Sequence, residues 1–419
     1  MNASSIMKKI VDEACDGARQ LAVMPSAVKN KVLLEMAENI DAKRTLIKQA
    51  NQKDIVKAES NKKNKAFIDR LRLDDNRIDS MCLMMKEVAA LNDPVGGILN
   101  EFKRPNGLVI KKIRVPIGVI GIIYESRPNV TADCVALCFK SGNAVILRGG
   151  SDAVNSNKAI YNVLKEASEN NGLKKGAFIL IEDTSRELVD AMLTVSEGID
   201  LIMPRGGESL IREVVSKSRV PVIKHYKGIC HVYVDVHADL NMAETICINA
   251  KIQRPGVCNA METMLVHKDV AETFLPTIAE KLKQAGVRLK GCARTLKILK
   301  NIEKAEDKDF SEEWLDLVLN IRVVNSLDEA VDHISKFGSK HSDAIVTENE
   351  TNAKKFTDEV DSAAVYVNAS TRFTDGGQFG LGAEIGISTD KIHARGPMGL
   401  EELCSYKYVV YGKGQVRNG

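Results

Sequence analysis

The segment at residues 251–260, KIQRPGVCNA, combines residue types that could support nucleophilic catalysis, with Cys258 as the candidate nucleophile. A cysteine becomes a strong nucleophile as the thiolate, which is favoured by exposure, nearby positive charge and backbone N–H groups. The Pro-Gly pair before Cys258 predicts a loop that a substrate can approach closely. Lys251 and Arg254 place two cations nearby in the sequence. An isolated cysteine is more often a buried, inert residue, so the rest of the chain must decide between the two interpretations.

The bulk composition excludes several classes of protein. A chain of 419 residues is too long to fold around one compact core, so we expect two or three domains. A net charge of +3 argues against a nucleic-acid-binding protein. The N-terminal residues lack the apolar core of a signal peptide, and no apolar run reaches membrane-spanning length, so we expect a cytoplasmic protein without membrane contact. Nine cysteines without paired short spacings indicate reduced thiols, and we expect no metal.

The pattern of apolar residues predicts an α/β protein. Helical spacing dominates as far as about residue 90. Apolar strands then alternate with helices, which is typical of a doubly wound parallel sheet, and the strands are expected at 117–124, 144–147, 177–181, 200–203 and 220–223. A second alternating region at 230–347 predicts a second α/β domain. The segment 406–411, YKYVVY, alternates like an exposed strand and is expected to pair with 108–114 in this chain or in a neighbour.

Two turns at predicted strand ends offer places for nucleotide phosphates, although the usual glycine-rich fingerprints are missing. Arg148 is followed by two glycines and Ser151, and Arg205 is followed by Gly206 and Gly207 before a predicted helix. Each turn joins an arginine to flexible backbone at the carboxyl end of a strand, where parallel sheets bind ligands and helix N-termini attract anions. A tight turn with a surface arginine is the alternative at each position. We interpret the two matching turns as a nucleotide-binding region.

Longer segments resemble the aldehyde dehydrogenase superfamily. The loop around Cys258 is similar to its Gly-x-x-Cys nucleophile pattern, and VPIGVI at 115–120 and SGNAVILR at 141–148 fall in the order found in that superfamily. More narrowly, the chain is similar to the γ-glutamyl phosphate reductases, and this likeness is carried by IIYESRPN at 122–129, GSKHSDAI at 338–345 and GLGAEIGIST at 380–389. The resemblance covers essentially the whole chain.

The resemblance implies a fold and a domain organisation. The fold is an aldehyde dehydrogenase-like α/β fold, with a doubly wound cofactor domain, an α/β catalytic domain and a small β element for oligomerisation. The NADP-binding domain is expected at residues 1–104 and 117–228, and the catalytic domain at 229–398. Oligomerisation strands are expected at 105–116 and 399–419, so the resemblance also implies a homo-oligomer.

The resemblance also implies a reaction. L-glutamyl 5-phosphate would be reduced by NADPH to L-glutamate 5-semialdehyde and phosphate through a thioester on Cys258, as the second step of proline biosynthesis from glutamate. Relatives that oxidise aldehydes carry a glutamate that activates water, whereas the matching segment here is HYKG at 225–228, without a carboxylate. Glutamate 5-kinase, which makes the substrate, is a candidate partner.

The same resemblance assigns roles to further residues. The oxyanion donor falls at Ser126, with Asn129 as the alternative. Arg148 stands where relatives have a lysine and would accept an NADP 2′-phosphate through a bidentate contact. Glu313 matches a ribose-binding glutamate. Substrate contacts are expected from Arg127, Glu384 and Arg395, with a simple solvated charge as the alternative for the last two.

Two alternatives are weighed against this reaction. The first is another acyl reductase of the superfamily that uses coenzyme A, or an aldehyde oxidiser. A requirement for phosphate in the aldehyde-oxidising direction would exclude the coenzyme A reaction. The second is a non-catalytic nucleotide-binding relative, against which substrate-protected alkylation of Cys258 would count.

Overall fold

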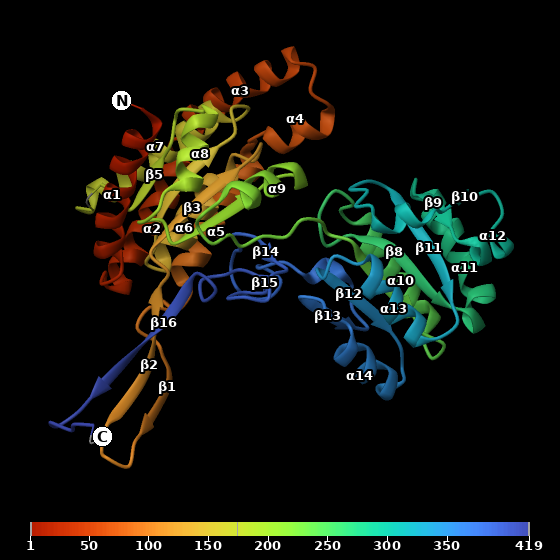
Figure 1. Ribbon diagram of the computed structural model, residues 1–419. Coiled ribbons are helices and arrows are strands. Elements are labelled where there is room, and N and C mark those ends of the chain that lie inside the picture. The colour runs from red at the N-terminus through yellow and green to blue at the C-terminus, as the bar shows by residue number, and fades with distance from the viewer. Residues whose placement is uncertain (1, 174, 418–419) are drawn as a thin grey trace. The chain divides into compact units, whose positions relative to one another are not determined.

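The computed structural model describes residues 2–173 and 175–417, and Figure 1 shows its helices and strands. The chain divides into two compact units. The first comprises Met1–Lys224, Gly380–Gly386 and Met398–Gly419, and the second comprises His225–Phe379 and Ile387–Pro397. Met1, Lys174, Asn418 and Gly419 belong to the predicted domain ranges but lie outside the described residues. In the described part of the chain, no helix has both the length and the apolar character needed to cross a membrane.

A four-stranded parallel sheet in the order β5-β4-β3-β6 forms the core of the first unit. Its strands are β3 (Val119–Tyr124), β4 (Ala144–Gly149), β5 (Phe178–Leu180) and β6 (Leu201–Arg205). All six residues of β3 are buried, as expected for a strand covered on both faces. The helices are α1 (Ala3–Leu21), α2 (Ser26–Ala42), α3 (Arg44–Ser60), α4 (Lys65–Leu71), α5 (Asp75–Ala90), α6 (Asn129–Lys140), α7 (Val154–Asn170), α8 (Arg186–Thr194) and α9 (Glu208–Lys217).

The predicted elements of this unit are present, with one correction. The expected strand at 220–223 forms no strand, and Val222 makes only a single parallel bridge to Ile202. Ser218 explains part of this outcome, because its hydroxyl donates to the carbonyl of Val220 over 2.7 Å and holds the chain in a turn.

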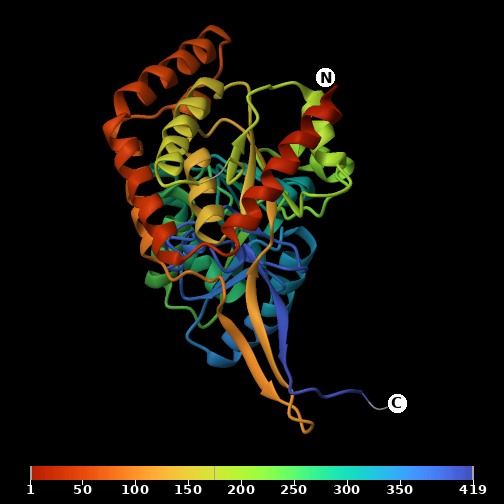
Figure 2. The ribbon, with the colours of Figure 1, turned by 90° about the vertical axis from the view of Figure 1, so that its left-hand side faces the viewer.

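An antiparallel arm with the strand order β1-β2-β16 belongs to the same unit. Its strands are β1 (Ile98–Lys103), β2 (Val109–Pro116) and β16 (Cys404–Tyr411), and Figures 1 and 2 show them extending from the rest of the unit. The predicted pairing of 406–411 is confirmed within this chain, because Tyr406 lies opposite Arg114 and Tyr411 opposite Val109. The strand β1 was not predicted.

A seven-stranded parallel sheet in the order β10-β9-β11-β8-β7-β12-β13 organises the second unit. Its strands are β7 (Cys230–Val234), β8 (Met261–His267), β9 (Arg288–Gly291), β10 (Glu303–Lys304), β11 (Val318–Val324), β12 (Ser342–Val346) and β13 (Ala364–Val367), and a separate pair is formed by β14 (Ile387–Ser388) and β15 (Gly396–Pro397). The helices are α10 (Leu240–Ile252), α11 (Lys268–Gln284), α12 (Ala293–Ile298), η1 (Asp307–Ser311), α13 (Leu327–Phe337), α14 (Glu350–Glu359) and η2 (Thr371–Phe373).

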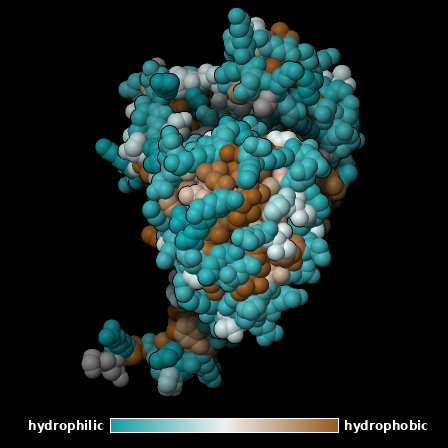
Figure 3. All heavy atoms as spheres, turned by 90° about the vertical axis from the view of Figure 1, so that its right-hand side faces the viewer, coloured by the Kyte–Doolittle hydropathy of each residue, from teal (hydrophilic) through white to brown (hydrophobic). Residues whose placement is uncertain are grey.

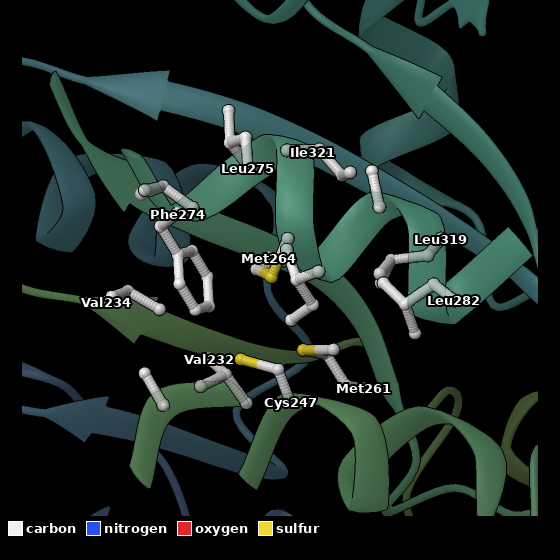
Figure 4. Packing of buried hydrophobic residues seen from close by; sticks show 14 of the residues in the cluster. Val232, Val234, Cys247, Met261, Met264, Phe274, Leu275, Leu282, Leu319 and Ile321 are labelled. Atoms are coloured by element: carbon white, nitrogen blue, oxygen red, sulfur yellow. The ribbon is translucent and has the colours of Figure 1, made fainter. Parts of the chain in front are cut away.

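One core cluster of the second unit lies between this sheet and the helices α10 and α11. Figure 4 shows side chains from both kinds of element packed against one another, among them Val232, Cys247, Met261, Met264, Phe274, Leu282 and Ile321. The strand β8, which follows the Cys258 loop, is buried at every one of its positions. This core therefore fixes the start of β8, directly after the Cys258 loop.

A buried histidine on α13 carries an electrostatic cost. The His333 ring lies 4.7 Å from the Phe337 ring and 5.0 Å from the Phe310 ring, measured between centroids. Neither of its ring nitrogens has a hydrogen-bond partner among the described residues. Burial lowers the pKa of His333 from 6.5 to about 2, with smaller contributions from His231 and Arg322.

We predict that this histidine makes the fold sensitive to acid. The pKa of His333 in the folded protein lies below its unfolded value of 6.5. The folded state is therefore fully stable with respect to this residue above pH 6.5, and it loses stability as the pH falls below that value. At pH 5 this residue should lower the free energy of unfolding by about 2 kcal/mol relative to pH 7.5. The variant His333→Phe keeps the aromatic packing and should lack this loss. Urea-unfolding midpoints at both pH values test this, and equal acid sensitivity in both proteins would contradict it.

Candidate active site

Cys258 lies on the loop between α10 and β8 and is partly buried. The next residue, Asn259, anchors the loop: its side-chain amide donates to the carbonyl of Thr374 over 2.8 Å. Its own carbonyl accepts the Thr371 hydroxyl over 2.7 Å. The prediction that the cysteine occupies a loop is confirmed, and the anchoring segment is η2, more than a hundred residues further along the chain.

Gly228 packs directly against the backbone of Cys258. A Cβ atom at Gly228 would lie 2.5 Å from the Cα of Cys258 and closer still to its carbonyl oxygen, so only glycine fits. The Gly228 N–H donates to Glu313 Oε1 over 2.9 Å. The thiol of Cys230 donates to the Cys258 carbonyl over 3.2 Å. The Cys258 loop is therefore held in place by close packing against Gly228 and by hydrogen bonds to both Gly228 and the Cys258 carbonyl.

The positive charge near Cys258 differs from the sequence-based expectation. Lys251 is fully buried and pairs with Glu262 over 2.8 Å, so its charge is directed to that carboxylate. Burial raises the pKa of Glu262 to about 7, and Lys251 opposes the shift. Arg372 supplies the cation instead: burial lowers its pKa, while electrostatic interaction with Cys258 is among the effects that raise it. Its guanidinium also hydrogen-bonds the side chain of Asn259.

Two imidazoles accompany the thiol. One ring nitrogen of His225, one of His341 and the Sγ of Cys258 lie within 4.8 Å of one another. Nδ1 of His225 lies 2.8 Å from the carbonyl oxygen of Ile387, which places a proton on that nitrogen. Burial lowers the pKa of His341 to about 4, against the effects of Asp343 and Glu313. At neutral pH His341 is therefore uncharged and can act as a base or as a ligand.

At the end of β4, Arg148 has one N–H group that lacks a hydrogen-bond partner among the described residues. Its Nη2 donates to the carbonyl of Thr184 over 2.7 Å, while Nε is buried without a partner among the described residues. Burial lowers the pKa of this guanidinium, and Asp183 and Glu125 oppose the shift. Ser151 is exposed two residues after the strand. A buried, unpaired guanidinium N–H is suited to an anionic or hydroxyl-bearing ligand.

The second predicted phosphate turn is arranged differently. Arg205 ends β6, and the exposed Gly206 and Gly207 precede α9. The Gly207 N–H donates to a carboxylate oxygen of Glu125 over 3.1 Å, so a negative group already lies at the N-terminus of this helix. Gly386, at φ +157°, packs against the Arg205 guanidinium. The two turns are therefore not equivalent, because an Arg148 N–H lacks a partner among the described residues whereas the Gly207 N–H is already bonded to Glu125.

The predicted oxyanion loop precedes α6. Ser126 has φ +42°, a left-handed conformation that is costly for a residue other than glycine. The side-chain amide of Asn129 donates to Asp133 over 2.9 Å. Burial raises the pKa of Asp133 to about 7, while Asn129 and Arg205 lower it. The neighbouring Arg127 is exposed.

The remaining predicted residues have distinct surroundings. Glu313 accepts from Gly228 beside the nucleophile loop. Arg395 donates to both the side chain and the carbonyl of Asp361, each over 2.8 Å, which favours a structural role. Glu384 is partly buried in the first unit. The second unit thus holds Cys258, Glu313 and Arg395, and the first holds Ser126, Arg127, Asn129, Arg148, Ser151, Arg205, Gly206, Gly207 and Glu384.

Sequence reasoning missed three features of this site. It did not identify Arg372, which lies far from the cysteine in sequence, and it assigned no site role to His341. His225 was noted only as a position that lacks a carboxylate. The segment GSKHS at 338–342 was a signal for His341, because it was already among the residues that carry the resemblance.

Comparison with known proteins places the chain in a family. The model of the aldehyde dehydrogenase family matches residues 2–290. The chain belongs to the aldehyde dehydrogenase family and is an oxidoreductase enzyme.

Relatives with more than half of their residues identical to this chain are named gamma-glutamyl phosphate reductase, which confirms the resemblance stated from the sequence. The relative from Thermodesulfovibrio yellowstonii is 53% identical and covers 100% of both chains. That from Caldanaerobacter subterraneus is 55% identical and covers 97% of this chain and 98% of its own. The crystal structure of the Thermotoga maritima protein is 48% identical with a TM-score of 0.96, covering 98% of this chain and 100% of its own.

We predict that Gly228→Ala will reduce the reactivity of Cys258 by about 100-fold, because a displacement of about 1 Å is enough to disrupt a catalytic arrangement. The matched control is Gly256→Ala in the same loop, whose Cβ would meet only the Leu315 carbonyl at 3.7 Å, an ordinary contact. Alkylation rates of Cys258, measured by peptide mass spectrometry, test the difference. Similar rates in the two variants would show that the contact with Gly228 does not position the thiol.

Proposed function

We propose that the protein uses NADPH to reduce L-glutamyl 5-phosphate to L-glutamate 5-semialdehyde and phosphate, as a step of proline biosynthesis. The observation that carries this proposal is the Cys258 thiol, fixed on its loop beside two imidazoles. The substrate follows from the shared name of relatives that cover the whole chain.

The first step is attack by sulfur on the acyl phosphate. The Cys258 thiol gives its proton to a neighbouring imidazole, and His225 is suited to this because its Nε2 keeps a lone pair while Nδ1 faces a carbonyl. The thiolate attacks the acyl carbon, a C–S bond forms, and the C–O bond to phosphate breaks. Arg372 interacts electrostatically with Cys258 and places a positive charge near the sulfur. The glutamyl group is then held on Cys258 as a thioester.

The developing oxyanion needs hydrogen-bond donors. The Cys258 backbone N–H is one candidate, and the family resemblance assigns the other to Ser126 or Asn129. Support for Asn129 comes from its hydrogen bond to Asp133, which fixes the orientation of its amide. Arg127, exposed in the same loop, is the proposed contact for the phosphate or carboxylate of the substrate.

The cofactor proposal rests on Arg148 and its surroundings. NADPH, when bound, supplies the hydride that reduces the thioester. The buried, unpartnered Nε of Arg148 fits a nucleotide phosphate or ribose oxygen, and Ser151 is proposed to contribute next to it. Arg205, Gly206 and Gly207 are proposed as further cofactor contacts, although Glu125 already accepts the Gly207 N–H. The contact of Glu313 with Gly228 favours support of the nucleophile loop over ribose binding.

The composition of the site favours transfer to hydride over hydrolysis. Among the described residues, the ligand atoms that lie within 4.8 Å of one another around Cys258 Sγ are its own sulfur and two imidazole nitrogens, and this cluster includes no carboxylate. Hydrolysis of a thioester by relatives depends on a base that activates water. A site without such a carboxylate preserves the thioester, which disfavours the aldehyde-oxidising alternative.

Assembly into a homo-oligomer is proposed to use the arm. Large hydrophobic side chains on its strands are exposed, including Ile98, Phe102, Tyr408 and Val410. Figure 3 shows a separate band of hydrophobic residues, which is not part of the arm and is surrounded by hydrophilic ones. Exposed strands with apolar side chains are surfaces that pair with another chain. Association with glutamate 5-kinase stays a prediction.

The reverse reaction tests the substrate most economically. With glutamate 5-semialdehyde, the protein should reduce NADP only when phosphate is present, because phosphate must release the acyl group from sulfur. Activity that requires coenzyme A in place of phosphate would support the alternative acyl reductase.

We predict that Cys258→Ser folds but loses this activity to below about one part in a thousand, since a serine hydroxyl is a far weaker nucleophile than a thiolate. The control is Cys292→Ser, which removes another partly buried thiol of the same unit and should stay active. Phosphate-dependent NADP reduction measures both. Turnover of the Cys258 variant above this level would exclude the thioester mechanism.

We also predict that Arg148→Ala weakens NADPH binding more than NADH binding, by about 10-fold or more, because the guanidinium is assigned to the 2′-phosphate. KM values for both nucleotides give the ratio. Arg148→Lys should retain part of the preference, as it keeps the charge without the bidentate geometry. An equal loss for NADPH and NADH would remove this residue from 2′-phosphate recognition.

A further inference from the structure

We propose that Cys258, His225 and His341 form a site for a thiophilic divalent metal ion such as Zn²⁺, and that the bound ion inhibits the enzyme by occupying its nucleophile. The inhibitory part of this proposal rests on the function proposed above. The ion is not a cofactor of the reaction, and binding and catalysis compete for the same sulfur.

The three ligand atoms are already close to one another. They lie within 4.8 Å of each other. In tetrahedral zinc coordination, with Zn–S near 2.3 Å and Zn–N near 2.05 Å, the ligand atoms are about 3.3 to 3.6 Å apart. No pair therefore has to approach by more than about 1.5 Å, a movement within the range of small side-chain adjustments. One thiolate and two neutral imidazoles form a typical zinc ligand set.

The outer contacts of both histidines match those of metal ligands. Metal-binding imidazoles usually donate their second ring N–H to a carbonyl, carboxylate or hydroxyl, which fixes the ring and its tautomer. Nδ1 of His225 lies 2.8 Å from the Ile387 carbonyl oxygen. Nδ1 of His341 lies 2.8 Å from Ser342 Oγ, which is itself 2.7 Å from Thr374 Oγ1. With the proton of each ring on Nδ1, the remaining nitrogen, Nε2, keeps its lone pair for a metal.

An independent observation points to a ligand at this place. Nε2 of the fully buried His341 has no hydrogen-bond partner among the described residues. An unmet polar atom in the interior costs free energy, and coordination to a cation would satisfy it.

Nearby charges permit a divalent ion. Arg372 interacts electrostatically with Cys258 and opposes a second cation. Glu313 and Asp343 place negative charge near His341, and this charge favours a cation. Binding converts the thiol to a zinc thiolate: the S–H bond breaks, an S–Zn bond forms and the proton passes to solvent. The sulfur lone pair is then committed to the metal, so acyl transfer stops until the ion is removed.

The experiment uses the full-length protein with Zn²⁺ and with Co²⁺ as its spectroscopic substitute. We expect one equivalent of Co²⁺ to produce a thiolate-to-metal absorption band that Zn²⁺ displaces. We expect Cys258→Ser to abolish the band, and His225→Gln and His341→Gln each to weaken affinity by at least about 10-fold. Zn²⁺ should inhibit turnover of the wild type, and a chelator should restore it.

Cys230 provides the matched control, because its sulfur lies 3.8 Å from Nδ1 of His341 and it is the other thiol at this histidine in the described structure. The variant Cys230→Ser should keep the band and the stoichiometry. A band that survives in Cys258→Ser but vanishes in Cys230→Ser would overturn the proposal. If His341→Gln fails to fold, His225→Gln decides, because His225 is only partly buried. Unchanged affinity in His225→Gln would overturn the three-ligand site.

The two proposals can fail separately. If Cys258→Ser is inactive but Zn²⁺ neither binds stoichiometrically nor inhibits the wild type, the metal site is wrong and the reductase assignment stands. If the cobalt band depends on all three residues but Cys258→Ser still turns over, the metal site stands and the assignment of the nucleophile is wrong.

Discussion

The contact between Gly228 and the backbone of Cys258 is the constraint on which the candidate active site depends. A side chain at position 228 would overlap the Cys258 backbone, so the two segments can approach only because one of them has no Cβ. Glu313 then fixes Gly228, and Asn259 fixes the other side of the loop. The sulfur is placed by backbone packing and hydrogen bonds from several segments, which is a more precise arrangement than a mobile loop could provide.

Three sets of groups determine the charge around the Cys258 sulfur. The buried Lys251 and Glu262 neutralise each other beneath the loop, and neither is left as an isolated charge in the interior. Arg372 supplies the positive charge that a thiolate requires. The imidazole of His341 provides a neutral base, since burial lowers its pKa to about 4. The same combination of thiolate and imidazole that suits a nucleophile also suits a thiophilic metal ion, which links the proposed inhibition to the proposed catalysis.

Much of the fold could be predicted because it is encoded in local periodicity. The apolar run of β3 and the alternation of the 406–411 segment identified strands directly, and the Pro-Gly break identified the cysteine loop. The failures arose where residues outside the segment itself, near or distant in sequence, decide the outcome. The segment 220–223 has strand-like composition, but a side-chain hydrogen bond from Ser218 turns the chain. The role of Lys251 depended on Glu262, and Arg372 reaches the cysteine loop only through the tertiary fold.

The central claim is that Cys258 carries the glutamyl group as a thioester, and mass spectrometry of the intact protein tests it most directly. The protein is incubated with glutamate 5-semialdehyde and NADP in the absence of phosphate, so that the acyl group cannot leave sulfur. The account predicts one glutamyl adduct per chain, located on Cys258 by peptide mapping and discharged when phosphate is added. An unmodified protein that nevertheless turns over with phosphate, or an adduct on another residue, would contradict it.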